Sequence, residues 1–329
     1  RISVYGFIIV ISCFLQAMFG VVQFFGFFQI STTLWVTGSF DNPAGFAACL
    51  CAGFPFVGFL LSDSNKYIRY VGGLIGFVIV IAVILSQSRA GIMSIAFICF
   101  ILLNMKFFHK RWVKYLSLLC FALLLSGCYW MKKDSADGRL LIWRCSVSMV
   151  KDAPWLGHGI GSFEARYMDY QADYFRQYGL NRYSMLADNV KHPFNEYLGV
   201  LLNFGFVGLL MILALITLLI YCYKKHPCAE KRIAFYSLIS IGVFSFFSYT
   251  FTYPFTWIVT FLCIIILTKE YIAKVFTCPI IKNTVCIFIL LCSFWGIYNL
   301  VKRVMAEKEW GNTSRLALCG ASGKTLPAY

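Results

Sequence analysis

The chain consists largely of long apolar runs separated by short polar breaks. Continuous apolar runs, rather than alternating polar and apolar positions, are typical of membrane-spanning α-helices, which need about 20 mostly apolar residues each. The candidate spans are Ser3–Phe28, Pro43–Leu61, Tyr70–Leu85, Gly91–Phe108, Val113–Trp130, Phe194–Tyr223, Ile233–Phe251, Phe255–Thr268 and Thr284–Leu300. We therefore expect an all-α, polytopic transmembrane helix bundle of about nine spans.

One long polar insertion, residues 131–192, separates two groups of spans. Four of its apolar residues recur at helical spacing and predict a helix that ends before Pro154; they are Leu140, Trp143, Val147 and Val150. We expect four regions: N-terminal transmembrane helices (1–130), a periplasmic loop subdomain (131–192), C-terminal transmembrane helices (193–301) and a periplasmic tail (302–329).

An aromatic stripe marks a second helix in the insertion, over Glu164–Tyr178. Its members are Phe163, Tyr167, Tyr170, Tyr174 and Tyr178. Aromatic residues gather where helices meet the membrane surface, so we interpret this stripe as a helix at the interface. A face that stacks on sugars is the alternative.

The orientation of the spans follows from the basic residues of the short loops, which stay on the cytoplasmic side. Those residues are Lys66, Arg69, Lys106, Lys110, Arg111, Lys114, Lys224, Lys225, Lys231, Arg232, Lys269, Lys274 and Lys282. With nine spans they all fall on one side. The opposite side then holds the turns at Gly38–Asn42 and Ser86–Ala90, the whole insertion and the tail.

Composition supports a membrane protein and argues against other classes. The chain is 60% hydrophobic and only 13% charged, unlike a soluble domain. Its formal net charge of +15 is spread over short loops, so we expect no nucleic-acid partner. The 14 Cys contain no CxxC pair and predict neither a zinc site nor a disulfide framework. No signal peptide is evident, and the chain begins without Met.

Acidic residues are absent from the centres of the spans. All 14 Asp and Glu fall in loops or at span ends, so the proton relay usual in transporters is missing. Arg89 is the informative charge, because its polar break at Ser86–Gly91 is too short for a solvated loop. Either an anionic group compensates Arg89 at the outer interface, or the side chain snorkels from a helix end.

Further candidates lie in the insertion and just after it. Arg139 follows Gly138 at the start of the first helix, and Arg144 comes about one and a half turns later. A turn rich in glycine, Pro154–Gly161, lacks the preceding β-strand of a nucleotide site, so it and its His158 are interpreted as structural.

His192 precedes Pro193, and proline favours the first helical turn. We therefore expect a helix to begin at Pro193, with its positive dipole end directed at a histidine presented at the membrane surface. That histidine is either a base or a helix cap.

These motifs, taken in order, resemble O-antigen ligases and polymerases. The resemblance covers most of Thr37–Leu210, and its elements are Asn42-Pro43, Ser86-x-Ser88-Arg89-x-Gly91, Gly138-Arg139, Pro154-x-Leu156-Gly157-x-Gly159-x-Gly161, Asn195-Glu196-Tyr197-Leu198 and the run Asn203–Leu209. The chain departs at Phe194, where the family often has histidine.

The resemblance implies a glycosyltransferase in the bacterial inner membrane with its active site facing the periplasm. The donor would be an undecaprenyl-diphosphate-linked glycan, and the acceptor a hydroxyl of lipid A-core, another glycan or a protein. Arg89 and Arg139 would bind the diphosphate and His192 would act as base, with no metal and no cofactor. Ser88, Gly138, Arg144, Asn195 and Glu196 would contact substrate.

The physical chemistry agrees with this, since arginine forks neutralise a diphosphate leaving group without a metal. An O-antigen polymerase or protein O-oligosaccharyltransferase of the same superfamily remains open, because the acceptor decides the name. A lipid or glycan transporter is the alternative from another class.

Overall fold

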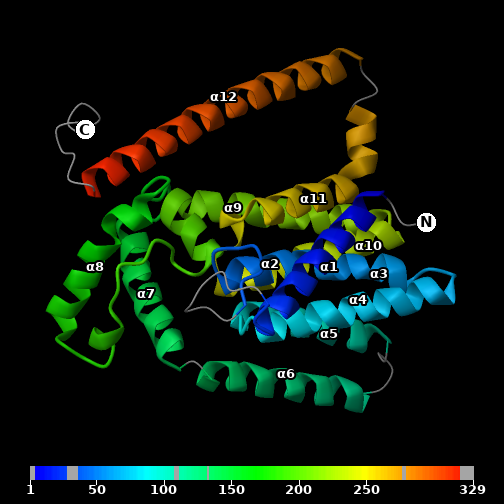
Figure 1. Ribbon diagram of the computed structural model, residues 1–329, viewed down its shortest axis with the longest axis horizontal. Helices are drawn as coiled ribbons and strands as arrows, with labels where there is room; N and C mark the ends of the chain where they lie inside the picture. Colours follow the sequence, from blue (N-terminus) through cyan, green and yellow to red (C-terminus); the bar gives the residue numbers. More distant parts are fainter. Residues whose placement is uncertain (1–3, 28–35, 107–110, 132, 276–278, 319–329) are drawn as a thin grey trace. The chain divides into compact units, whose positions relative to one another are not determined.

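The structure, a computed structural model, describes residues 4–27, 36–106, 111–131, 133–275 and 279–318. Every regular element in these ranges is helical, which confirms the predicted all-α class (Figure 1). The elements are α1 Val4–Phe24, α2 Pro43–Gly53, η1 Phe54–Phe56, α3 Val57–Leu61, α4 Lys66–Leu85, α5 Arg89–Lys106, α6 Arg111–Met131, α7 Lys133–Asp152, α8 Ser162–Tyr178, η2 Ser184–Leu186, α9 Glu196–Lys225, α10 Ala229–Phe247, η3 Thr250–Thr252, α11 Pro254–Val275 and α12 Pro279–Leu318.

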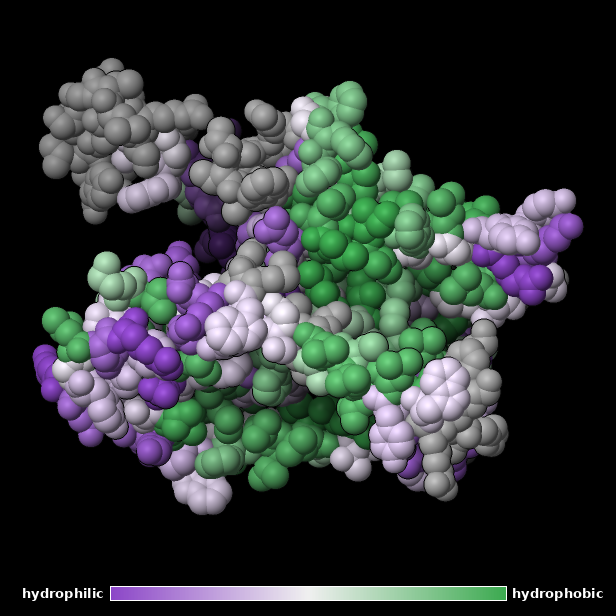
Figure 2. All heavy atoms as spheres, turned by 90° about the horizontal axis from the view of Figure 1, so that it is seen from below, coloured by the Kyte–Doolittle hydropathy of each residue, from purple (hydrophilic) through white to green (hydrophobic). Residues whose placement is uncertain are grey.

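The chain is a multi-pass membrane protein. Within the described residues, 5 helices are long and apolar enough to cross a membrane, namely Val4–Phe24, Pro43–Leu61, Lys66–Leu85, Glu196–Lys225 and Pro254–Ala273. Each of the nine apolar runs is largely helical in its described residues, but the predicted count of nine spans is not shown. Helices α5 and α6 carry only shorter apolar segments, Arg89–Met105 and Trp112–Leu123, and the runs on α10 and α12 are not among the five. A broad apolar band covers the helices in Figure 2, and hydrophilic residues gather at the end formed by α7 and α8.

The chain divides into two compact units, 1–268 and 269–329. In the second unit, α12 is a continuous helix of 40 residues that contains the expected span Thr284–Leu300. The helix continues beyond that span to Leu318, into the region expected to be a tail. An ion pair between Arg303 and Glu307, 3.0 Å apart, stabilises one turn of this extension.

Helix α10 forms the centre of the first unit, where it packs against α2, η1, α5 and α9. Small residues allow the close approach, and serine hydroxyls hold the helices together. Ser237 donates to the carbonyl of Ala52 at 2.6 Å and Ser240 to that of Cys51 at 2.7 Å. Ser94 of α5 meets Ser240 at 2.8 Å, so one serine links three helices.

The insertion builds a small core of its own, in which α7 packs beside α8 (Figure 1). Phe163 and Tyr167 are 5% and 1% exposed and stack at 4.8 Å, and Tyr170 and Tyr174 pack against the same core. These residues therefore face a core covered by α7 rather than a membrane surface, while the position of α8 at the interface stays a prediction. Tyr178 alone is largely exposed, at 62%.

Helix α9 is interrupted at Gly205, whose backbone has φ 62° and ψ −159°. The break leaves Glu196–Phe204 on one side and Phe206–Lys225 on the other. The second piece alone is about as long as a membrane span. The first piece, Glu196–Phe204, instead packs with α7 and α8, where Leu202 is part of their core.

The glycine turn fills the break in α9. His158 donates its backbone N–H to Leu202 at 2.7 Å and Gly159 to Asn203 at 3.1 Å. In return, Phe206 donates to Pro154 at 2.8 Å and Val207 to Trp155 at 3.2 Å. The turn thus satisfies the backbone groups that the interruption leaves without helical partners.

Both segments of this contact require glycine. Gly157, Gly159 and Gly161 all have positive φ, which confirms the tight-turn interpretation. A Cβ on Gly157 would lie 2.6 Å from the carbonyl carbon of Asn203, and one on Gly205 would lie 2.6 Å from the carbonyl oxygen of Pro154. The two backbones are therefore in direct contact.

We predict that Gly157→Ala and Gly205→Ala each destabilise the protein by more than about 3 kcal/mol, because backbone strain and steric overlap add. Gly161→Ala is the matched control, since Gly161 also has positive φ but nothing lies within 4 Å of its Cβ position. It should cost only about 1–2 kcal/mol. Unfolding of the purified protein in mixed micelles measures the difference, and equal losses at all three positions would refute the contact.

Candidate functional site

Arg89 is the first residue of α5, which begins within the predicted polar break Ser86–Gly91. Ser86 and Ser88 are buried there, and the Ser88 hydroxyl accepts the backbone N–H of Gly91 at 3.4 Å, so Ser88 caps the helix. Arg89 donates from Nη2 to the hydroxyl of Ser135 on α7 at 2.8 Å. The break therefore directs Arg89 toward the inserted subdomain.

Arg139 lies on α7 and reaches the end of α10. Its Nη1 donates to the carbonyl of Phe247 at 2.7 Å, and its guanidinium lies 5.1 Å from the centre of the Phe194 ring. Burial and the positive charge of Arg89 lower the pKa of Arg139 to about 10. The side chain stays protonated at neutral pH, and the two arginines repel each other, which favours an anion near them.

His192 packs face to face with Tyr249, with ring centroids 4.8 Å apart and planes inclined by 24°. Burial lowers the pKa of His192, while Glu164 raises it and Lys191 lowers it. The imidazole is therefore neutral at physiological pH. Within the part of the chain that the structure describes, no hydrogen bond engages its ring nitrogens.

The helix after His192 does not begin at Pro193, as the sequence suggested. It begins at Glu196, and Asn195 is its N-cap, with the side chain accepting from the backbone of Leu198 at 3.0 Å. Phe194 adopts φ 52° and forms a turn between proline and cap. The helix dipole is therefore farther from His192 than expected, and burial is the main cause of the lowered pKa.

Asn195 and Glu196 both bind backbone groups. Glu196 accepts the N–H of Phe251 at 2.8 Å through Oε1. This bond joins the start of α9 to the segment between α10 and α11. The structure thus gives both residues a local structural contact, while contact with substrate stays a prediction.

Arg144 is not brought together with Arg139. It is exposed, donates to the Tyr174 hydroxyl at 3.4 Å and lies over the Tyr183 ring at 5.1 Å. Gly138 faces Leu186, whose Cβ is 4.0 Å from the position of a glycine Cβ. Gly138 and Arg144, both expected to contact substrate, therefore lie on the side of α7 that faces η2.

His158 is held at both ring nitrogens. Arg166 lies 3.0 Å from Nδ1 and the carbonyl of Met149 lies 2.7 Å from Nε2. Because arginine only donates, Nδ1 accepts and Nε2–H donates, which fixes one neutral tautomer. This arrangement supports the structural interpretation of His158.

Sequence reasoning missed Tyr249, around which the site gathers. It lies in the segment between α10 and α11, which was assigned to the end of an apolar run. Its hydroxyl accepts from Nδ2 of Asn42 at 3.3 Å, and Asn42 also accepts from the Tyr253 hydroxyl at 3.0 Å. The available signal was the polar aromatic run Tyr249–Tyr253 directly before Pro254.

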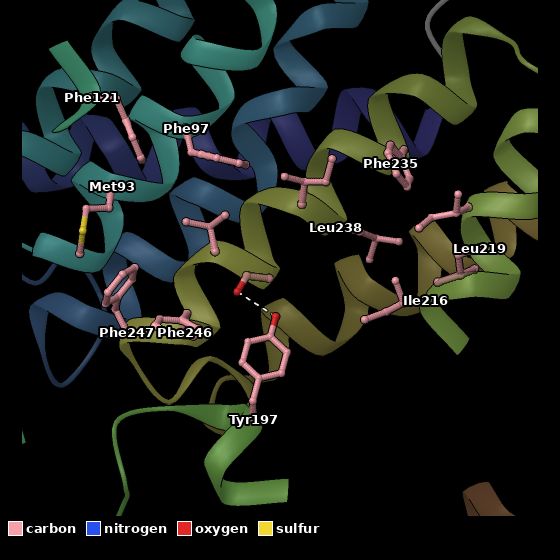
Figure 3. Close-up of a pocket in the computed structure, with 14 residues that line it drawn as sticks. Met93, Phe97, Phe121, Tyr197, Ile216, Leu219, Phe235, Leu238, Phe246 and Phe247 are labelled. Atoms are coloured by element: carbon pink, nitrogen blue, oxygen red, sulfur yellow. Dashed lines mark hydrogen bonds between the residues drawn. The ribbon is translucent and has the colours of Figure 1, made fainter. Parts of the chain in front are cut away.

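An apolar cavity of about 740 Å³ reaches Phe247 at the end of α10 (Figure 3). Its walls come from α5, α6, α9 and α10, and include Met93, Phe97, Phe121, Ile216, Phe235, Leu238, Phe246 and Phe247. The Tyr197 hydroxyl, which donates to Gly242 at 3.0 Å, is one of the few polar groups there. Phe247 both lines the cavity and accepts the Arg139 hydrogen bond.

Comparison with known proteins gives a family match for the central part of the chain. Among curated proteins, none matches it. Residues 74–213 match the family model described as O-antigen ligase. This segment contains Arg89, Arg139 and His192, whereas Asn42 and Tyr249 lie outside it. Residues 74–213 of this membrane protein therefore form a domain of the O-antigen ligase family.

Proposed function

We propose that this protein transfers a glycan from an undecaprenyl-diphosphate carrier to an acceptor hydroxyl at the periplasmic face of a bacterial inner membrane. The observation that carries the proposal is the arrangement of Arg139, which is desolvated, lies in the field of Arg89 and is anchored where an apolar cavity begins. The family match over residues 74–213 supports the same class of reaction.

The two arginines suit a diphosphate. Each guanidinium offers planar paired donors and stays ionised, so together they neutralise the charge that grows as the glycosidic bond to phosphate breaks. Repulsion between Arg89 and Arg139 is relieved when an anion binds, so the two guanidinium groups together attract an anion.

The cavity suits the lipid part of the donor. Its lining is almost entirely aliphatic and aromatic, and it extends from Phe247 along α9 and α10. An isoprenoid chain gains about 25 cal/mol per Å² of apolar surface that leaves water. A lipid diphosphate would thus place its tail in the cavity and its head group at Arg139.

His192 suits the role of general base. Its imidazole is neutral because of burial, and among the described residues the ring contact of His192 is its stack on Tyr249, without a hydrogen bond to its nitrogens. In the proposed step, the acceptor hydroxyl loses its proton to His192 as its oxygen attacks the anomeric carbon. The bond to the diphosphate oxygen breaks, and lipid diphosphate leaves with the electron pair.

The metal-independent mechanism is a prediction of the same proposal. Among the described residues, no group of three His, Cys, Asp or Glu side chains converges. The arginine pair supplies the positive charge that a divalent cation would otherwise bring to the diphosphate. The acceptor, whether lipid A-core, another glycan or a protein, distinguishes a ligase from a polymerase or a protein O-oligosaccharyltransferase.

We predict that the 131–192 insertion faces the periplasm. Single cysteines at Asp134 and Gln177, both exposed, should react with an impermeant thiol reagent in intact spheroplasts of a cysteine-free background. A variant that keeps the native Cys228 as its single cysteine, exposed in the basic loop before α10, should react only after permeabilisation. The reverse pattern would invert the orientation.

We predict that Lys replaces neither Arg89 nor Arg139, because a point charge lacks the planar fork. In a deletion strain, each Arg→Ala variant should reduce glycan transfer by about 100-fold or more, with the protein still present in the membrane. Arg176→Lys is the control, since the side chain of Arg176 is 81% exposed and pairs with the exposed Asp173 on the same helix. The lipid profile of the strain identifies the acceptor: unmodified core indicates a ligase, and core with a single repeat unit indicates a polymerase.

A chelator should leave transfer by the purified protein unchanged. Loss of activity in EDTA, with recovery on addition of a divalent ion, would contradict the metal-independent mechanism. Full activity of both Lys variants would contradict recognition by arginine forks.

We predict that transfer falls as the pH drops through the lowered pKa of His192 and is constant above it, because only the neutral ring accepts a proton. Lys191→Gln should shift this fall to higher pH, since removing a positive charge raises the pKa. Glu164→Gln should shift it to lower pH. Lys191 and Glu164 lie 3.8 Å apart, so removing one charge leaves the opposite charge of the other unpaired. That unpaired charge moves the pKa of His192 further in the same direction.

His192→Ala should reduce turnover by about 10²–10⁴-fold while donor binding persists. Rates from purified variants across a pH series measure both effects. Near-normal transfer by His192→Ala, or pH profiles that move together in the Lys191 and Glu164 variants, would refute the assignment of the base.

A further inference from the structure

Tyr249 is the only aromatic side chain that stacks face to face on His192 among the described residues. The same ring meets Phe194 edge to face, at 5.3 Å and 65°. Tyr249 therefore contacts the residues on both sides of Pro193. Since no hydrogen bond holds the His192 ring in the described part of the chain, the stack is what fixes its plane.

The hydroxyl of Tyr249 is fixed by Asn42, the N-cap of α2. Asn42 Oδ1 accepts the backbone N–H of Gly45 at 2.9 Å, which settles the orientation of its amide. Its Nδ2 must then face the Tyr249 hydroxyl, 3.3 Å away. A helix cap in the N-terminal half of the chain thus orients a ring in the C-terminal half.

The backbone on the C-terminal side of Tyr249 is also held. Ser245 donates to the Thr250 hydroxyl at 2.9 Å, and Thr256 donates to the Thr250 carbonyl at 2.7 Å. Glu196 accepts the N–H of Phe251. Side-chain bonds from α10, α11 and α9 therefore fix the segment that carries the tyrosine.

Tyr249 is also connected to Arg139 through Phe194. The Phe194 ring meets Tyr249 at 5.3 Å, and the Arg139 guanidinium lies 5.1 Å from the centre of the same ring. One residue thus touches the proposed base and lies near the proposed diphosphate site. Tyr249 is therefore placed to hold His192 in a fixed position relative to the donor.

We propose that Tyr249, oriented by Asn42, is a positioning residue that fixes the plane of the His192 ring for proton transfer. This inference rests on the proposed function. A misplaced base costs up to about 100-fold in rate even when it is chemically intact. Tyr249 therefore acts through His192, without itself exchanging a proton with substrate.

The test compares Tyr249→Leu, Tyr249→Phe and Asn42→Ser in the full chain. Leucine removes the stack, phenylalanine keeps the stack and removes the bond to Asn42, and serine keeps the cap of α2 and removes the amide donor. Tyr223→Leu is the matched control, because Tyr223 stacks on Phe235 at 4.6 Å, a comparable ring pair without contact to His192.

The first readout is NMR of ¹³C,¹⁵N-histidine in the purified protein. The chain has 4 His, so the signal of His192 is identified by its loss in His192→Gln. We expect an upfield ring-current shift of His192 in the wild type, in Tyr249→Phe and in Tyr223→Leu. The shift should disappear in Tyr249→Leu.

The second readout is transfer from undecaprenyl-diphosphate-linked glycan to membranes of a deletion strain. We expect kcat to fall about 100-fold in Tyr249→Leu with KM for the donor unchanged. Tyr249→Phe and Asn42→Ser should each lose about fivefold, the size of one neutral hydrogen bond. Tyr223→Leu should transfer at the wild-type rate.

Two results would overturn the inference: a His192 shift that persists in Tyr249→Leu, or a shift that disappears while kcat stays at the wild-type value. A rise in KM for the donor at an unchanged kcat would make Tyr249 a donor-binding residue, and it would also overturn the inference. Absence of transfer by the wild type itself would instead overturn the proposed function and the catalytic part of the inference, and the NMR shift would still decide the ring contact.

Discussion

The direct backbone contact between Gly157 and Gly205 determines how the inserted subdomain joins the bundle. Neither position has room for a Cβ, because each faces the main chain of the other segment. Four backbone hydrogen bonds connect the turn to the interrupted helix, for example His158 to Leu202 and Phe206 to Pro154. Without the turn, the interruption of α9 would leave these groups unsatisfied in an apolar surrounding, where each costs several kcal/mol.

The site depends on this junction through the first piece of α9. That piece begins with the Asn195 cap, and Glu196 holds the backbone of Phe251. The held segment carries Tyr249, which stacks on His192 just before the same helix. A break in one helix therefore aligns groups from the insertion, α9 and the α10–α11 segment.

Electrostatics give this arrangement its chemical character. Arg139 is desolvated and shares its surroundings with Arg89, which lowers its pKa although both remain charged. A fold would avoid such repulsion if stability were the only requirement, and perturbed groups of this kind gather at functional sites. The neutral His192 and the apolar cavity complete an environment suited to a lipid-linked anion.

The sequence predicted the features that depend on local pattern. Apolar runs identified the helices, the polar break was found at the start of α5, and the glycines indicated a tight turn, which the structure forms with positive φ. Long-range contacts were not predictable. The aromatic stripe at Phe163 belongs to a core because α7 covers it, and periodicity does not reveal what lies opposite a helix face.

The helix start and Tyr249 show the same limit. Pro193 favoured a helix at that residue, but Asn195 provides the better cap and Phe194 turns the chain between them. Tyr249 was missed because its partners His192 and Asn42 are distant in sequence, and only the tertiary fold brings the three together.

The most direct test is a cryo-electron microscopy structure of the protein in lipid nanodiscs with undecaprenyl diphosphate. We expect diphosphate density between the guanidinium groups of Arg89 and Arg139, and isoprenoid density in the cavity that reaches Phe247. His192 should lie beside the diphosphate, with its ring on Tyr249. Diphosphate density away from both arginines, or bound through a metal ion on carboxylates, would contradict the account.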